Sequence, residues 1–367
     1  MTEQTSTPDS EANSAWPTFQ GNFERTGVTP NATELHEPVE STWKFDAPRG
    51  SVDADYTPVV ANDTVYVGAE YWEDGEIGRI HALSLATGAE QWQFDTRQAV
   101  DAPPTVADGT VFGTCGDGTV YALNASTGAH NWSFTTGGHI ATTPTVTAET
   151  VIIGSNDGYV YALNRTTGNE TWRFHAGSFL QCHPTLGNET VFIGSTGRDG
   201  HLYALDIASG EEQWSIQAED HMMAAPAFDD GVVYQSAHDE KLYAVDAETG
   251  VIQWTFQTGS KMQSSPAVTT DTIVVGTDDG DVLGVDRHTG DCVWRTTLAQ
   301  AVYASPAIVR NMAYVGCADG SLVAVDLETG SVRWSLSLDG SVTSPAVVGQ
   351  SIVVGTTNGN VYRIDSA

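Results

Sequence analysis

The chain of 367 residues can build a substantial core, because 40% of its residues are hydrophobic and 9% are aromatic. Its 47 acidic residues stand against 15 lysines and arginines, and the net charge of −32 repels nucleic-acid phosphates and anionic lipid headgroups. We therefore predict no nucleic-acid partner, and since no apolar run reaches 18 residues, we also predict no transmembrane segment.

The acidic composition also predicts the medium in which the protein works. In dilute buffer, where the Debye length is about 30 Å at 0.01 M salt, so acidic a chain repels itself, but molar salt shortens that length to about 3 Å. Only Lys44, Lys241 and Lys261 are lysines. We interpret this as adaptation to concentrated salt, and the composition resembles that of proteins from salt-loving archaea.

The amino-terminal part divides into two predicted segments. Residues 1–15 are polar and acidic without an apolar core, so we expect a disordered tail rather than a signal or transit peptide. Residues 16–40 are expected to form a lead-in segment. Everything from 41 to 367 is expected to be one domain.

An internal repeat of about 40 residues determines the predicted fold of that domain. A Thr-Gly or Ser-Gly pair precedes seven of its eight periodic tryptophans, and a proline opens an apolar run in each period. The tryptophans are Trp43, Trp92, Trp132, Trp172, Trp214, Trp254, Trp294 and Trp334. We expect these tryptophans to pack against the neighbouring unit and to carry no chemistry.

Each period contains four short strand patterns separated by turn residues. The sixth reads SSPAV, TIVVGT, GDVLGVD and CVWRTT, and the Asp-Gly pairs fit tight hairpin turns better than calcium loops. No helical periodicity occurs. We therefore predict an all-β fold, an eight-bladed β-propeller of four-stranded antiparallel blades.

The two chain ends are predicted to close the ring. The last period ends at Ala367 before any tryptophan strand, whereas the first tryptophan strand, at residues 41–45, has no blade before it. The amino-terminal strand should therefore complete the eighth blade, with Trp43 beside residues 361–363. Such closure removes the open edges of the ring.

The repeated unit, read for example as ALNASTGAHNW and AVDAETGVIQW, resembles the tryptophan-docking motif of the pyrroloquinoline-quinone-type, or BamB-like, eight-bladed propellers. Residues 16–27 are also similar to the lead-in that precedes the first blade in that family. The resemblance implies two branches. One is a non-catalytic binding branch; the other consists of dehydrogenases that hold the quinone against a disulfide between adjacent cysteines and a tryptophan, with calcium beside a catalytic Asp.

The four cysteines and the blade-one loops complete the sequence predictions. Cys115, Cys182, Cys292 and Cys317 form no CxxC or adjacent pair, so we expect buried free thiols. Blade one carries six extra residues in its second hairpin, within residues 69–78, and a longer entry loop. Both should lie on one face of the disc, where propellers commonly build binding sites.

Residues that vary within the repeat should gather at the mouth of the central channel, on that same face. At the third and fifth positions before each proline many are polar or titratable. The candidate ligand-binding residues are Asp53, Asp55, Asp101, His139, Gln181, His221, Lys261, Gln263 and Tyr303, with Trp72 as a lid. The alternative interpretation is a solvated channel mouth whose polar wall residues vary without serving a ligand. No metal site is predicted, because His139 and His221 lie two blades apart.

Three functions remain open at this stage. The preferred one is a non-catalytic, monomeric binding or scaffold propeller that offers its mouth and blade-one loops to a protein partner or small ligand, with no cofactor and no catalytic residue. The alternatives are a quinone-dependent dehydrogenase with pyrroloquinoline quinone and calcium, and a glycan-acting enzyme that uses the carboxylates of Asp53, Asp55 and Asp101.

Localisation rests on two opposing signals. The chain shows no export signal, which favours the cytoplasm, but seven Asn-x-Ser/Thr sequons occur among its asparagines. The sequons are Asn31, Asn62, Asn124, Asn131, Asn164, Asn169 and Asn188. We favour the cell exterior, although Asn and Thr are also common in turns.

Overall fold

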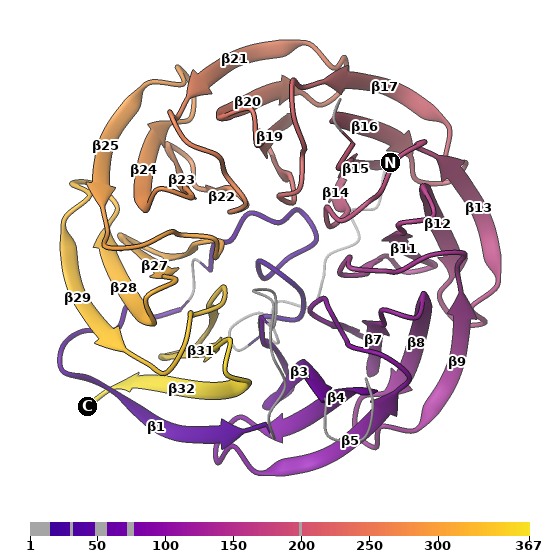
Figure 1. The fold of residues 1–367 in the computed structure, drawn as a ribbon, viewed down its shortest axis with the longest axis horizontal. Helices are drawn as coiled ribbons and strands as arrows, with labels where there is room; N and C mark the ends of the chain where they lie inside the picture. Colours follow the sequence, from indigo (N-terminus) through magenta and orange to yellow (C-terminus); the bar gives the residue numbers. More distant parts are fainter. Residues whose placement is uncertain (1–14, 30–31, 48–56, 72–76, 198–199) are drawn as a thin grey trace, which may run out of the picture.

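The computed structural model describes residues 15–29, 32–47, 57–71, 77–197 and 200–367. Within these residues, 32 strands and no helix form eight four-stranded antiparallel sheets arranged in a ring (Figure 1). No helix there could span a bilayer. The predicted all-β, eight-bladed propeller is confirmed.

Each blade is a meander whose first strand lines the central channel and whose fourth lies on the rim (Figure 1). Blade 1 consists of β2 (Val59–Ala61), β3 (Thr64–Tyr71), β4 (Ile77–Ser84) and β5 (Glu90–Thr96), and blade 2 of β6 (Thr105–Ala107), β7 (Thr110–Thr114), β8 (Thr119–Asn124) and β9 (His130–Thr135). Blade 3 consists of β10 (Thr145–Val146), β11 (Thr150–Gly154), β12 (Tyr159–Asn164) and β13 (Glu170–His175), and blade 4 of β14 (Thr185–Gly187), β15 (Thr190–Gly194), β16 (His201–Asp206) and β17 (Glu212–Gln217). Blade 5 consists of β18 (Ala227–Asp229), β19 (Val232–Ser236), β20 (Lys241–Asp246) and β21 (Ile252–Gln257). Blade 6 consists of β22 (Ala267–Val268), β23 (Thr272–Gly276), β24 (Asp281–Asp286) and β25 (Cys292–Thr297). Blade 7 consists of β26 (Ala307–Val309), β27 (Met312–Gly316), β28 (Ser321–Asp326) and β29 (Val332–Ser337).

Blade 8 is assembled from both ends of the chain. Its strands are β30 (Ala346–Val348), β31 (Ser351–Gly355), β32 (Asn360–Ser366) and, from the amino-terminal side, β1 (Val39–Asp46). In the antiparallel register of β1 and β32, Trp43 lies opposite Arg363 and Phe45 opposite Val361. Figure 1 shows the indigo β1 beside the yellow β32. The predicted closure is therefore confirmed.

The glycine four residues before seven of the periodic tryptophans is required by the fit between blades. Gly168 has a φ of 73°, a left-handed conformation that side chains rarely adopt, and a Cβ there would lie 2.5 Å from the Trp132 ring of the preceding blade. The same ring donates its indole N–H to the carbonyl of Arg165, in that same turn, at 2.9 Å. Turn and ring thus form one inter-blade contact.

This contact recurs at all eight periodic tryptophans. The indole nitrogens of Trp43, Trp92, Trp132, Trp172, Trp214, Trp254, Trp294 and Trp334 donate to the carbonyls of Leu85, Ala125, Arg165, Ile207, Ala247, Arg287, Leu327 and Leu35, respectively. Seven acceptors lie in the turn before the fourth strand. The eighth, Leu35, lies in the lead-in segment, which replaces the turn that blade 8 lacks.

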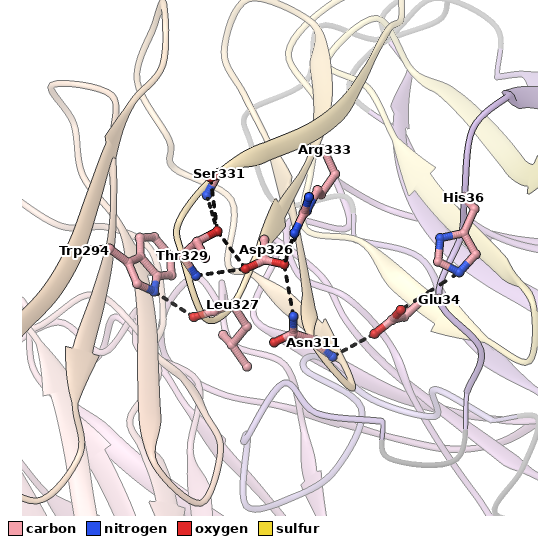
Figure 2. A network of polar contacts seen from close by, with 9 residues as sticks. All are labelled: Glu34, His36, Trp294, Asn311, Asp326, Leu327, Thr329, Ser331 and Arg333. Carbon is pink, nitrogen blue, oxygen red and sulfur yellow. Dashed lines mark hydrogen bonds and ion pairs between the residues drawn. The ribbon is translucent and has the colours of Figure 1, made fainter.

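The segment around Leu35 is also hydrogen-bonded to blade 7. Figure 2 shows the nearly buried carboxylate of Asp326 between Asn311, Thr329 and Arg333, and Arg333 approaches it to 2.6 Å. The backbone N–H of Asn311 donates to Glu34 of the lead-in at 2.8 Å. The hydrogen bond from Arg333 lowers the pKa of Asp326 to about 2, so the carboxylate stays ionised in this network.

One cysteine prediction is wrong. Cys115, Cys182 and Cys317 are buried free thiols as expected, but Cys292 is exposed. It begins β25 on the rim, two residues before Trp294, where the outermost strand has no neighbour on its free edge. Free thiols are often buried, but this position is at the solvent edge of the sheet.

The lead-in segment lies inside the ring, and Figure 1 shows its indigo trace at the centre. Trp16 forms a two-way backbone bridge with Val60 of blade 1. Further backbone N–H groups of the innermost strands donate to this segment: Val106 to Pro17, Leu186 to Phe23, Phe228 to Glu24, Val268 to Thr26 and Ile308 to Gly27, at 2.7–2.9 Å. The free inner edges of six blades are thus covered.

Arg25 anchors this segment at the level of blades 3 and 4. Its fully buried guanidinium donates to the carbonyls of Phe19 and Pro184 and to the hydroxyls of Thr18 and Thr145, at 2.8–3.2 Å. Four neutral oxygens from three elements therefore satisfy one buried cation. This arrangement fixes the position of the lead-in segment, because each lost hydrogen bond would leave a buried polar group unpaired.

Candidate binding site at the channel mouth

The two faces of the disc are formed by different loops and turns of the blades. On the mouth face of blades 2–8, the loop entering the innermost strand meets the turn between the second and third strands, as when the Asn156 N–H donates to the His139 carbonyl. On the opposite, back face, the first turn of a blade meets its third turn, as when the Arg165 N–H donates to the Glu149 carbonyl. The sequence-predicted site residues that the structure describes belong to the mouth face.

Each of blades 2–7 contributes a pair of variable residues to the mouth. The N–H of the turn residue donates to the carbonyl of the residue five positions before the proline, at 2.8–3.0 Å. The pairs are Ala99 with Gly116, His139 with Asn156, Phe179 with Thr196, His221 with His238, Lys261 with Asp278, and Ala301 with Ala318. The backbone is therefore constant while the side chains vary.

Asp101 and His139 form an ion-pairing dyad across blades 2 and 3. Their Oδ2 and Nε2 atoms are 2.7 Å apart, and both side chains are partly exposed. The Asp101 carboxylate accepts a hydrogen bond from the protonated imidazole and so raises the pKa of His139. Gly116 makes room for the pair, since a Cβ there would lie 3.1 Å from the Asp101 carboxylate.

A second polar cluster joins blades 5 and 6. The Asp220 carboxylate lies 3.5 Å from His221 Nε2 and 3.6 Å from Lys261 Nζ. Gln263 donates to Asp278 at 3.3 Å, and the rings of His221 and His238 lie 5.8 Å apart in an edge-on arrangement.

The electrostatics of this second cluster follow from partial burial. Burial lowers the pKa of His238 and raises the pKa of Asp278, whereas the N–H of His221 donates to Asp220 and lowers the pKa of that carboxyl. His221 Nδ1, His238 Nε2 and Asp278 Oδ1 are shielded from solvent and have no hydrogen-bond partner among the described residues. Buried polar atoms are usually hydrogen-bonded, so these three leave hydrogen-bonding capacity unused in the cluster.

Two aromatic side chains stand between the polar clusters. Phe179 of blade 4 is 59% exposed and Tyr303 of blade 7 is 38% exposed. Gln181 is partly exposed at the same level as Tyr303. A small hollow of about 10 Å³ beside Tyr303 is lined by Gly316, Ser341 and Thr357, among others.

The structure brings together part of the predicted set. Asp101 meets His139, and His221 and Lys261 meet at Asp220, whereas Gln181 and Tyr303 stand apart on blades 4 and 7. Asp53, Asp55 and Trp72 lie outside the described residues, so the acidic entry loop of blade one and the proposed lid remain predictions.

Sequence reasoning missed the second residue of each mouth pair. Asn156, His238 and Asp278 occupy the position before the turn Asp. Across blades 2–8 this position holds seven residues of six types: Gly116, Asn156, Thr196, His238, Asp278, Ala318 and Thr357. Such variation beside a fixed turn was visible in the repeat. Asp220, which directly precedes the candidate His221, was missed as well.

The described residues do not fit a quinone cofactor with calcium. The resemblance implies a disulfide between adjacent cysteines, and no two of the four cysteines are neighbours in the sequence. Across the described ranges, no three His, Cys, Asp or Glu side chains are grouped so as to hold a metal ion.

Two family models match the sequence. The model described as "Beta-alanine-activating enzyme, beta-propeller" matches residues 148–367, more than half of the chain. The model described as "Outer membrane protein assembly factor BamB" matches residues 76–181. No curated protein matches the sequence.

Solved structures share the fold at low sequence identity. BamB from Moraxella catarrhalis is 18% identical with a TM-score of 0.75, covering 89% of this chain and 97% of its own. A europium-containing methanol dehydrogenase is 15% identical with a TM-score of 0.85, covering 97% and 98%. The quinohemoprotein alcohol dehydrogenase from Comamonas testosteroni is 16% identical with a TM-score of 0.82, covering 96% and 80%. Since an assembly protein and two dehydrogenases share one architecture, the fold does not select between binding and catalysis.

Proposed function

The chain belongs to the propeller family described as "Beta-alanine-activating enzyme, beta-propeller", and from this premise we propose that it is a non-catalytic, monomeric binding propeller that receives a protein partner at its channel mouth. The observation that carries the proposal is the ring of paired variable residues on blades 2–7. Packing needs only the backbone of these pairs, so the side chains are free to serve recognition.

The spread of the polar groups favours a broad contact over a compact catalytic centre. The dyad of Asp101 and His139 belongs to blades 2 and 3, whereas the cluster around Asp220 belongs to blades 5 and 6. Blade 4 with its exposed Phe179 separates them. Charged groups flanking exposed aromatic rings are typical of protein interfaces, in which aromatic residues are enriched.

The lead-in segment supports the same proposal from inside the ring. Because it covers the inner edges of six blades, the partner has no comparable edge to pair with there. A projecting loop that enters from the mouth face would instead meet the polar clusters. BamB, which shares the fold, is described as an outer membrane protein assembly factor, and a protein partner agrees with that description.

We further propose that the protein acts at the cell exterior.

The glycan-acting and quinone-dependent alternatives have no specific observation among the described residues in their favour. The first would need carboxylates at Asp53 and Asp55, which lie outside those residues, and the second lacks its adjacent cysteines.

Site-specific photo-crosslinking in the native cells tests the proposal. A photoreactive residue replaces Gln263 at the mouth in one variant and Glu149 on the back face in the control. We expect one discrete adduct at position 263 and none at 149. Lys261→Glu, which reverses a mouth charge, should reduce that adduct at least about tenfold, because a charge of the wrong sign opposes docking.

Two outcomes would contradict the proposal. One is equal crosslinking at both positions, or at neither. The other is a bound-quinone spectrum, or alcohol-dependent dye reduction, when the protein is incubated with pyrroloquinoline quinone and calcium in high salt.

A further inference from the structure

We propose that the back face of blades 1–4 carries N-linked glycans at Asn62, Asn131, Asn169 and Asn188. All four asparagines are exposed and begin Asn-x-Ser/Thr sequons. There is one such asparagine in each of four consecutive blades, and the sequence contains no sequon after residue 190.

These four sequons differ from two others in the same blades. Asn124 accepts four hydrogen bonds through Oδ1, from the backbone and hydroxyl groups of Ser126 and Thr127, and Asn164 accepts three. Both asparagines cap turns and are only partly exposed. By contrast, the side-chain amides of the four proposed sites make no hydrogen bond within the described residues, so their Nδ2 atoms are accessible.

Turn geometry does not require asparagine at the proposed sites. Asn62 and Asn188 occupy the first turn of their blades with φ of 49° and 56°, but Asp108, Asp230 and Arg310 adopt similar φ in the same turn of other blades. A serine or threonine two positions after this turn residue is common in the repeat, so the asparagine is the residue that completes the sequon. Turn geometry therefore does not account for asparagine at positions 62 and 188.

All four sites lie on the face opposite the mouth. Asn62 and Asn188 are in first turns, which contact third turns through bonds such as Leu85 N–H to the Asp63 carbonyl and Ile207 N–H to the Glu189 carbonyl. Asn169 immediately precedes β13, and Asn131 is the second residue of β9, close to the third turn of its blade. Glycans there would leave the mouth open.

A polar cleft beside Asn131 offers space for sugar rings. Its volume is about 460 Å³. The lining residues are Asp108, Thr110, Asn131, Trp132, Ala148, Arg165 and Thr166. Hydroxyl, guanidinium and indole groups of this kind satisfy sugar hydroxyls and pack against sugar faces.

The reaction needs a lipid-linked oligosaccharide as donor and an oligosaccharyltransferase as catalyst. A bond forms between the asparagine Nδ2 and the anomeric carbon of the sugar, while the bond from that carbon to the phosphate oxygen of the polyprenyl carrier breaks. The carrier leaves with the electron pair, and the amide proton passes to a base of the transferase. No oxidant or reductant is involved.

Mass spectrometry of the protein purified from its native cells tests the proposal. Digestion at acidic residues suits a chain with 47 of them, and we expect glycopeptides at the four sites with unmodified Asn124 and Asn164. The N62Q/N131Q/N169Q/N188Q variant should lose these glycans completely. The matched control, N124D/N164D, should keep them, because aspartate already caps the same turn in blades 4–7 at Asp206, Asp246, Asp286 and Asp326.

A native mass equal to that of the bare sequence overturns the proposal, and so does any glycan distribution that includes Asn124 or Asn164 or omits any of the four sites. Asn31 lies outside the described residues and does not enter the test. Because the readout is mass alone, its result is separate from that of the mouth-crosslinking experiment.

Discussion

At the residue scale, the environment decides what a histidine does in this propeller. His139 at the mouth is partly exposed, and its pKa is raised by Asp101. His183 lies one residue before the proline of blade 4, is buried, and accepts the N–H of Thr143 through Nδ1 at 2.9 Å. Burial lowers the pKa of His183 to about 3, with a smaller contribution from the charge of Arg25.

The buried His183 predicts an acid-sensitive component of stability. Below the unfolded-state pKa of 6.5 the unfolded chain binds a proton that the folded chain refuses until about pH 3, so falling pH favours unfolding. Within that window His183 should cost about 1.4 kcal/mol of stability for each unit of acidification. The free energy of unfolding is measured by denaturant titration between pH 7 and pH 4 in high salt.

His183→Asn is the matched variant for that measurement. Asparagine keeps an acceptor for the Thr143 N–H but does not titrate. Since the carboxylates titrate equally in both proteins, the difference between their pH profiles isolates His183. Parallel profiles would show that His183 is protonated in the folded state.

At the element scale, the lead-in segment is an internal support of the ring. Its backbone carbonyls accept hydrogen bonds from Val106, Leu186, Phe228, Val268 and Ile308, each on an innermost strand of two or three residues. Strands that short cannot protect their free edges, so the segment replaces the neighbour that each lacks. The segment is therefore part of the propeller core rather than an appendage in front of blade 1.

Removal of residues 1–29 should expose these inner edges. We expect the amides of Val106, Leu186, Phe228, Val268 and Ile308 to exchange with deuterium at least about a hundredfold faster, because each loses its acceptor. Leu35 and Trp334 remain in this variant, so the ring can still close. Native-state hydrogen exchange detected by mass spectrometry checks the prediction.

Truncation of residues 1–14 alone is the control, and it leaves every one of these acceptors in place. Exchange as slow in the longer truncation as in this control would mean that solvent is excluded from the channel by the blades themselves. The lead-in would then be a passive filling of the channel.

At the scale of the whole molecule, sequence predicted what repeats and missed what occurs once. The tryptophan spacing and the truncated last period were enough for eight blades and for the pairing of Trp43 with Arg363, because each blade imposes the same packing on its neighbour. Arg25 has no counterpart in the repeat, and its partners Pro184 and Thr145 lie more than a hundred residues away, so no local pattern could indicate its position. The mouth pairs lie between these extremes, since they vary at fixed positions.

The net charge of −32 predicts how the closed ring responds to salt. Folding concentrates like charges, and their repulsion is screened as the Debye length falls from about 30 Å at 0.01 M to about 3 Å at 1 M. We expect the Tm to rise by roughly 5–10 °C over this range of potassium chloride, as a gain of a few kcal/mol would produce. The E149Q/E248Q/E328Q variant removes three exposed charges whose carboxylates make no hydrogen bond or ion pair among the described residues, so its salt dependence should be shallower. A Tm independent of salt, or an equally steep rise in that variant, would show that charge repulsion does not limit the stability of this propeller.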